Sequence, residues 1–237
     1  MTKRIACWLV TALVTGAALA DDAVDMKVNP QNSYVEEVRS EQAGGSYDIH
    51  LLISQGLDTD PTVYYVSTDA ADDRSPRVEI SPAGDTWITW WRDLATDEVR
   101  VREFRHASQT LGADRPVSQS GENARNPEIV FDGTSPWIVY EVHGGSKSVV
   151  VSSITDEPDP IGSGVTLRTT SYGGNVDARI HFASGHLWVT WVDGGSYVGW
   201  CEYDYGDAAW SAAAYQSYSG GSVGAARQAI RDSILGP

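Results

Sequence analysis

The chain has 237 residues, of which 41% are hydrophobic and 21% are charged. Its 32 acidic residues outnumber 17 basic ones, which gives a formal net charge of −15 at pH 7. A field of this sign repels nucleic acid and anionic lipid, so neither is expected as a partner. The acidity favours solubility or a salty medium, and binding of calcium or of a cationic partner is the alternative interpretation.

The first 20 residues are typical of a secretory signal peptide. Lys3 and Arg4 form a basic start, Ile5 to Gly16 is a short apolar segment, and Ala18-Leu19-Ala20 is a cleavage motif. The apolar segment is shorter than the roughly 20 residues of a membrane helix. We therefore expect cleavage after Ala20 and a soluble bacterial protein that is periplasmic or secreted.

Residues 21–237 would carry 15 basic and 32 acidic residues, a net charge of −17. Their length suits one domain with a sizeable core. Because Cys7 lies in the leader, Cys201 would be alone and no intrachain disulfide could form. Packing must therefore hold the fold, and Cys201 is expected to be a buried, inert thiol.

An internal repeat of about 51 residues organises the rest of the chain. Its first landmark recurs at Pro76, Pro127 and Ala178, each followed by alternating apolar residues. Its second landmark is a tryptophan, found at Trp87, Trp137 and Trp188. Turn-forming residues lie between the two landmarks, and further short strands follow, so each repeat predicts the four-stranded unit of a β-propeller blade.

The second strand of each repeat is apolar on both faces. In 87–91 and in 188–192, large or β-branched side chains occupy both parities of the strand. A strand of a two-sheet sandwich would alternate apolar with polar residues, because one of its faces meets water. Strands covered on both sides are expected where each blade lies between two others, so this pattern favours a propeller.

The repeat predicts an all-β, four-bladed propeller that forms one domain over residues 21–237. The blades are placed at about 33–69, 74–120, 125–171 and 176–219. Asp21 to Asn32 carries little apolar pattern, so the first blade is expected to lack its own innermost strand. Residues 224–235 are expected to supply that strand and to close the ring, which would remove open sheet edges.

Two alternatives stay open at this point. Val223, Arg227, Ile230 and Ile234 recur at helical spacing, which favours an amphipathic helix in the tail. The chain could also be half of a larger six- or eight-bladed ring built by two chains, or a piece of a longer protein. Either a monomer or a homodimer is therefore expected.

The repeat resembles the blades of bacterial secreted proteins in the sialidase-like superfamily, over about residues 62–205. Arg74-Ser75-Pro76 and Arg125-Asn126-Pro127 are similar to the family's Arg-x-Pro element, and Trp87 with Trp90 to its Trp-x-x-Trp element. The family's Asp-box is not matched after Ser81, and the chain is too short for a six-bladed sialidase ring. The resemblance thus implies the fold, and we expect a module that is not an enzyme.

Three arginines are candidate binding residues. Arg74 and Arg125 begin innermost strands, and Arg227 lies near the equivalent place in the tail. Around a propeller axis their guanidinium groups could bind a carboxylate or a sulfate. The alternative is that each arginine pairs with a neighbouring carboxylate, such as Asp72, Asp73, Glu122 or Asp177.

Glu141 and Asp193, just after the tryptophan-rich strands, complete the set of candidate binding residues. They are also the candidate pair for glycoside hydrolysis, which needs two carboxyl groups about 5–10 Å apart. The histidines show no metal-ligand spacing, and the acidic turns Asp58 to Asp60 and Asp156 to Asp159 lack calcium-loop spacing. No catalytic residue, metal or cofactor is predicted.

Taken together, these features predict an exported, non-catalytic propeller that binds a carbohydrate, a peptide or an envelope protein through its loops and a shallow axial pocket. A sialidase-like glycoside hydrolase is the alternative function.

Overall fold

The computed structural model describes residues 24–56, 59–154, 164–170, 176–218 and 221–236. The predicted signal peptide, Asp58 and Asp156 to Asp159 lie outside these ranges. Among the described residues, no helix is both long and apolar enough to cross a membrane.

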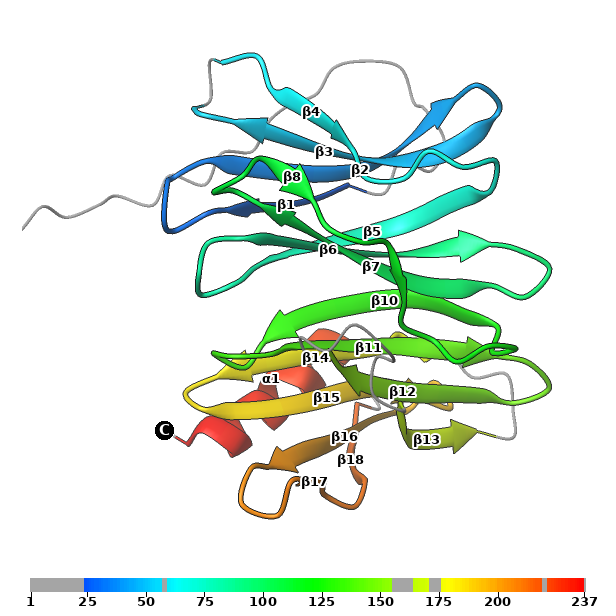
Figure 1. Cartoon of the computed structure of the whole chain (residues 1–237). Coiled ribbons are helices and arrows are strands. Elements are labelled where there is room, and N and C mark those ends of the chain that lie inside the picture. The colour runs from blue at the N-terminus through cyan, green and yellow to red at the C-terminus, as the bar shows by residue number, and fades with distance from the viewer. Residues whose placement is uncertain (1–23, 57–58, 155–163, 171–175, 219–220, 237) are drawn as a thin grey trace, which may run out of the picture.

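Four antiparallel sheets follow one another along the chain and stack face to face (Figure 1). The first contains β1 (Val24–Val28), β2 (Val35–Ala43), β3 (Ser46–Ser54) and β4 (Thr62–Tyr65). The second contains β5 (Asp72–Ile80), β6 (Thr86–Asp93), β7 (Glu98–Arg105), β8 (Thr110–Leu111) and β9 (Arg115–Pro116). The last two short strands both pair with β7.

The third sheet contains β10 (Ala124–Phe131), β11 (Pro136–His143), β12 (Lys147–Ser153) and β13 (Val165–Thr170). The fourth contains β14 (Arg179–Ala183), β15 (His186–Asp193), β16 (Tyr197–Asp204), β17 (Ala209–Trp210) and β18 (Ala214–Ser217). The first strands of successive sheets pack against one another, β1 on β5, β5 on β10 and β10 on β14, so these strands are the innermost of the fold.

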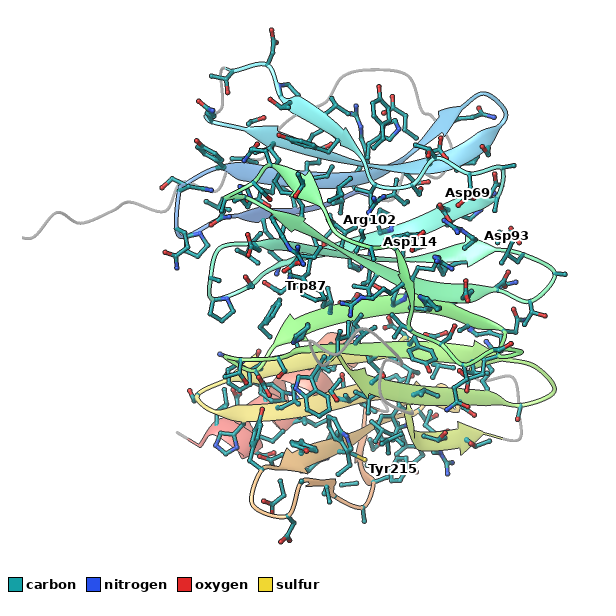
Figure 2. The ribbon with its side chains drawn as sticks, in the orientation of Figure 1. Asp69, Trp87, Asp93, Arg102, Asp114 and Tyr215 are labelled. Carbon is teal, nitrogen blue, oxygen red and sulfur yellow. The ribbon has the colours of Figure 1, made fainter. Side chains whose placement is uncertain are left out.

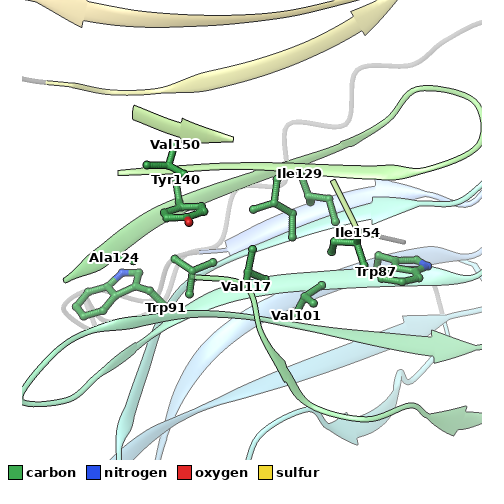
Figure 3. Packing of buried hydrophobic residues seen from close by; sticks show 11 residues of the cluster. Trp87, Trp91, Val101, Val117, Ala124, Ile129, Tyr140, Val150 and Ile154 are labelled. Carbon is green, nitrogen blue, oxygen red and sulfur yellow. The ribbon is translucent and has the colours of Figure 1, made fainter. Parts of the chain in front are cut away.

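The tryptophan-rich strands are buried on both faces, as the sequence predicts. Trp90, Tyr140 and Trp191 have no exposed surface and pack toward the preceding sheet. The first ring of each strand packs in the opposite direction, and Figure 3 shows Trp87 in the core between the second and third sheets, with Ile129 and Tyr140. Cys201 is buried as expected, and burial raises its pKa to about 11.

The prediction that the first sheet lacks an innermost strand is wrong. β1 pairs with β2 along its whole length, from Val24 opposite Arg39 to Val28 opposite Val35. Its inward side chains are polar: Asp25 accepts from the backbone N–H of Val78 at 2.9 Å. The alternating apolar residues of β1, Val24, Met26 and Val28, are exposed, so backbone pairing and such polar contacts hold β1 rather than apolar burial.

The prediction of a closing strand at 224–235 is also wrong, because Val223–Leu235 form the helix α1. The Ser222 side chain caps α1 by accepting from the backbone N–H of Ala225. Ala226 and Ile230 are buried against Trp188 and Val198 of the fourth sheet. The helix thus covers the face that a further sheet would cover, and the first sheet lies at the other end of the stack (Figure 1).

Candidate functional site

One position of the innermost strands carries a charged side chain in three successive sheets. These residues are Arg77 of β5, Glu128 of β10 and Arg179 of β14, each 51 positions from the next. The Arg77 Nε atom donates to Glu128 Oε1 at 3.0 Å, and Arg179 Nη1 donates to the same oxygen. We call these three residues the axial row.

Two positions before the axial row, each sheet has a residue with left-handed backbone. Ser75, Asn126 and Asp177 have φ angles of 50°, 52° and 34°. The strand register shifts between Arg74 and Arg77 and again between Arg125 and Glu128, so Ser75 and Asn126 lie in β-bulges. Left-handed backbone is unfavourable for most residues with a Cβ, such as Ser75, and less so for Asn and Asp. Strain of this kind collects at functional sites.

The three left-handed residues and the axial row line one cavity of about 530 Å³. This volume lies in the range of about 300–1,000 Å³ that is usual for small-molecule sites. Glu141 and His143 of β11 form part of its wall, and Val223 at the start of α1 forms another. A second cavity of about 350 Å³ shares Arg77, Glu128 and Arg179 and extends to Asp25 and Lys27 of β1. The axial row therefore stands between two cavities.

Glu141 is the most deeply buried carboxylate of the cavity wall, with 3% of its surface exposed. Its Oε2 atom lies 2.8 Å from His143 Nε2 and accepts from Asn126 Nδ2 at 3.1 Å, while the backbone N–H of Ala178 donates to Oε1 at 3.3 Å. Burial has the largest effect on the Glu141 pKa and raises it, but these hydrogen bonds together hold the pKa below its ordinary value. Glu141 is therefore ionised at neutral pH.

The charged groups of the cavity wall balance one another. Three are cationic, namely Arg77, Lys147 and Arg179. Three are anionic, namely Glu128, Glu141 and Asp177. The wall thus offers ionic hydrogen bonds of both kinds without the surplus of negative charge that marks the whole chain.

The three predicted arginines are held by carboxylates, the alternative that the sequence left open. Arg74 Nη2 donates to Asp72 Oδ2 at 2.7 Å, Arg125 pairs with Asp97, and Arg227 Nη1 donates to Asp177 Oδ2 at 3.0 Å. Arg74 also lies 4.9 Å from the ring centre of Tyr47, and Arg125 lies 5.0 Å from that of Trp91. Both arginines thereby join their sheet to the preceding one, and neither lines the two axial cavities.

The other predicted partner carboxylates bind elsewhere. Asp73 forms a bidentate ion pair with Arg92. Nε of Arg92 donates to Oδ1 of Asp73 at 2.8 Å, and Nη2 donates to Oδ2 at 3.0 Å. Asp69 and Asp114, both labelled in Figure 2, also form ion pairs with Arg92. Glu122 accepts from the Tyr140 hydroxyl at 3.1 Å.

Glu141 and Asp193, the predicted carboxylate pair, do not line one cavity. Asp193 Oδ2 accepts from Nε of Arg168 at 3.1 Å, and Asp193 is absent from the wall that contains Glu141. In the described ranges, no cluster of three or more His, Cys, Asp or Glu side chains has the geometry to hold a metal ion.

Sequence reasoning missed the axial row, Ser75, Asn126 and His143, and it named Asp177 only as a possible partner of an arginine. A signal for the axial row was present, because its members keep the 51-residue step. The apolar landmarks define the repeat, however, and a position that alternates between Arg and Glu does not stand out as part of it.

No family model matches the chain, and no curated protein matches its sequence. Solved structures do. The periplasmic gluconolactonase of Pseudomonas aeruginosa is 17% identical, with a TM-score of 0.52 over 84% of this chain and 58% of that one. A putative exo-β-1,3-galactanase from Bifidobacterium bifidum is 11% identical, with a TM-score of 0.55 over 83% and 70% of the two chains.

The endo-arabinase of Bacteroides thetaiotaomicron is 13% identical, with a TM-score of 0.54 over 87% of this chain and 78% of that one. These neighbours are β-propeller proteins. The chain adopts a β-propeller fold. At such low identities the likeness shows the fold alone, and the chain spans only 58% of the gluconolactonase length. The sialidase-like part of the resemblance stays a prediction.

Proposed function

We propose that this propeller is an exported glycan-binding protein, in which each sheet is one of four blades and the 530 Å³ cavity accepts a short saccharide. The observation that carries this proposal is the placement of Ser75, Asn126 and Asp177. Three blades each present a strained, polar residue to the same cavity. Strain repeated at one position of the blade is costly, and it is understandable where the strained residues serve a common ligand.

The chemistry of the wall supports a saccharide ligand. Sugars carry many hydroxyl groups that both donate and accept, and the cavity offers guanidinium donors beside carboxylate acceptors. The names of the neighbouring structures point the same way, since a galactanase and an arabinase act on glycans. A peptide or an envelope protein would be a different ligand for the same scaffold.

Titration calorimetry of the purified chain tests the proposal. The neutral probes are arabino-oligosaccharides and β-1,3-linked galacto-oligosaccharides, and the acidic probes are oligogalacturonate and gluconate. We expect saturable binding of at least one probe, and its loss in Val223→Trp, which places an indole on the cavity wall. Val63→Trp, on an exposed valine outside the cavity, is the matched control. Absence of binding to all probes, or equal binding by both variants, contradicts the proposal.

A glycoside hydrolase is the second candidate function, favoured by the three carboxylates Glu128, Glu141 and Asp177 on one wall. Hydrolysis of this kind needs one ionised carboxylate and one protonated carboxylic acid. The lowered pKa of Glu141 favours it for the role of the ionised carboxylate. The test is turnover of the same oligosaccharides by the wild type and by Glu141→Gln, Asp177→Asn and Asp193→Asn. Turnover that is absent, or unchanged in all variants, removes this function.

Assembly of two chains into a larger ring would bury the outer face of the first blade. That face exposes Val24, Met26 and Val28 at 52%, 56% and 64%. Light scattering measures the mass directly, and the mass of one chain rules out the larger ring.

A further inference from the structure

We infer that the saccharide is neutral and that Arg77 and Glu128 recognise two adjacent hydroxyl groups on it. This inference rests on the proposed function, because it names the ligand class of the same cavity. It assigns a binding role to two members of the axial row.

Among the described residues, each of the two side chains keeps one polar atom without a partner. Arg77 donates from Nε to Glu128 and from Nη1 to the carbonyl oxygen of Pro76. Glu128 accepts from both Arg77 and Arg179 at Oε1. Within the described part of the chain, no acceptor is bonded to Arg77 Nη2 and no donor to Glu128 Oε2. The two side chains are 28% and 20% exposed and line both axial cavities.

The pairing places an ionic donor beside an ionic acceptor, neither of which has a partner among the residues that the structure describes. One sugar hydroxyl can accept from Arg77 Nη2 while its neighbour donates to Glu128 Oε2, and hydrogen bonds to ionised groups are stronger than neutral ones. The Nε–Oε1 bond of 3.0 Å holds the two groups in a fixed relation, so little side-chain freedom is lost on binding. Ser75, whose hydroxyl has no partner among the described residues, lies in the same wall and adds a third contact.

Charge argues against an acidic sugar. Binding of a carboxylate by a guanidinium is strongest when two N–H groups of one fork are available. In Arg77, Nε donates to Glu128 and one N–H of Nη1 donates to Pro76, so each fork contains a nitrogen that is already bonded. Arg179 is bound by both Glu128 and Asp177. The carboxylates Glu128, Glu141 and Asp177 already offset the three cations of the wall, so no surplus of positive charge remains for an anionic ligand. The net charge of −15 repels anions at longer range.

The test compares two variants with parent and modified probes. Arg77→Lys keeps the charge but loses the planar fork, and Glu128→Gln keeps the shape but loses the ionic acceptor. The probes are the neutral oligosaccharides above and versions that lack a single hydroxyl group. We expect the wild type to bind one singly deoxygenated probe at least tenfold more weakly than its parent. Glu128→Gln should bind that parent at least tenfold more weakly than the wild type and should no longer distinguish the two probes.

Matched controls lie away from the axis. Arg100 of β7 binds Glu98 and Asp114, and Glu103 of the same strand binds Arg105, so Arg100→Lys and Glu103→Gln make the same changes in other ion pairs. Both control variants should bind like the wild type. Near-UV circular dichroism checks that each variant is folded.

Ser75→Gly keeps the inference testable if an axial variant does not fold. It removes an uncommitted hydroxyl and suits the left-handed backbone of that position. It should bind the parent probe threefold to tenfold more weakly.

The outcomes separate the two proposals. Binding of no saccharide at all overturns the proposed function. Binding that prefers oligogalacturonate, or that is unchanged in Arg77→Lys and Glu128→Gln, leaves the glycan-binding function standing and overturns the present inference. Equal losses in the axial and control variants also overturn it, because they show a general effect of weakened ion pairs.

Discussion

His143 and Glu141 point to the same side of β11, and Nε2 of His143 lies 2.8 Å from Oε2 of Glu141. The carboxylate thereby gains a partner inside the sheet, in addition to its bond from Ala178 in the next sheet. Because the pKa of Glu141 is lowered in the fold, its ionised form stabilises the protein above the ordinary value of 4.5. That contribution is lost as the pH falls below 4.5 and through the lower pKa of the folded state.

Glu141→Gln should therefore lower the free energy of unfolding at pH 7 by about 1–3 kcal/mol, because an amide cannot replace a carboxylate that accepts three hydrogen bonds. Urea unfolding between pH 3 and 7 measures this. The difference between variant and wild type should shrink toward acid pH. A difference that stays constant with pH would show that the ionised form of Glu141 is not what stabilises the fold.

His181 gives a separate pH dependence at a higher pH. Burial, with the nearby guanidinium groups of Arg227, Arg179 and Arg231, lowers the pKa of His181 from 6.5 to about 4. Between these two pH values, His181 is protonated in the unfolded chain and neutral in the folded chain. The free energy of unfolding therefore falls as the pH drops from 6.5 to 4. His181→Gln should flatten this part of the curve. An unchanged slope in His181→Gln would contradict the prediction.

Ser75→Gly should raise the stability by up to about 1 kcal/mol. The substitution relieves left-handed strain of about 1–2 kcal/mol, against an entropy cost of about 0.5–1 kcal/mol for glycine. Asn126→Gly is the control. Asn126 donates a hydrogen bond to Glu141, and the loss of this bond offsets the stability gained from the relief of backbone strain. Thermal melting measures both, and a Ser75→Gly protein that melts below the wild type contradicts the prediction.

Gly199→Ala should destabilise the fourth sheet. A Cβ atom at Gly199 would lie 2.5 Å from Nε1 of Trp191, a ring with no exposed surface. Overpacking of this kind costs about 1–3 kcal/mol. Gly145→Ala has open space around its Cβ and should change the urea midpoint little. Equal midpoints for the two variants would mean that the contact with Trp191 is not tight.

Ile230→Ala should cost about 2–4 kcal/mol, because Ile230 of α1 is 3% exposed and packs on the fourth sheet with Trp188. Ala229→Ser, on the exposed side of the same helix, should cost less than about 0.5 kcal/mol. Fluorescence of the tryptophans during unfolding follows both variants. A small effect of Ile230→Ala would show that α1 is not a structural cover for the last sheet.

The sequence alone determined the repeat and the sheets. Trp87, Trp137 and Trp188 keep their spacing, and apolar residues at both parities of their strands predicted burial from two sides. This information is local, because successive side chains of a strand point to opposite faces and their polarity indicates which faces are buried. Three of the four sheets follow from counting such strands, and the first follows from stepping back 51 residues along the chain.

Only the tertiary structure decided what covers each sheet and what faces the axis. β1 is held by backbone pairing and polar contacts, and α1 replaces a further sheet over Trp188, a choice that helical and strand spacing left open. The cavity depends on side chains 51 residues apart, such as Arg77 and Glu128, that meet because their sheets pack together. The alternation of apolar and polar residues along a strand shows which of its faces is buried. It does not show which group buries that face, because that group lies far away along the chain.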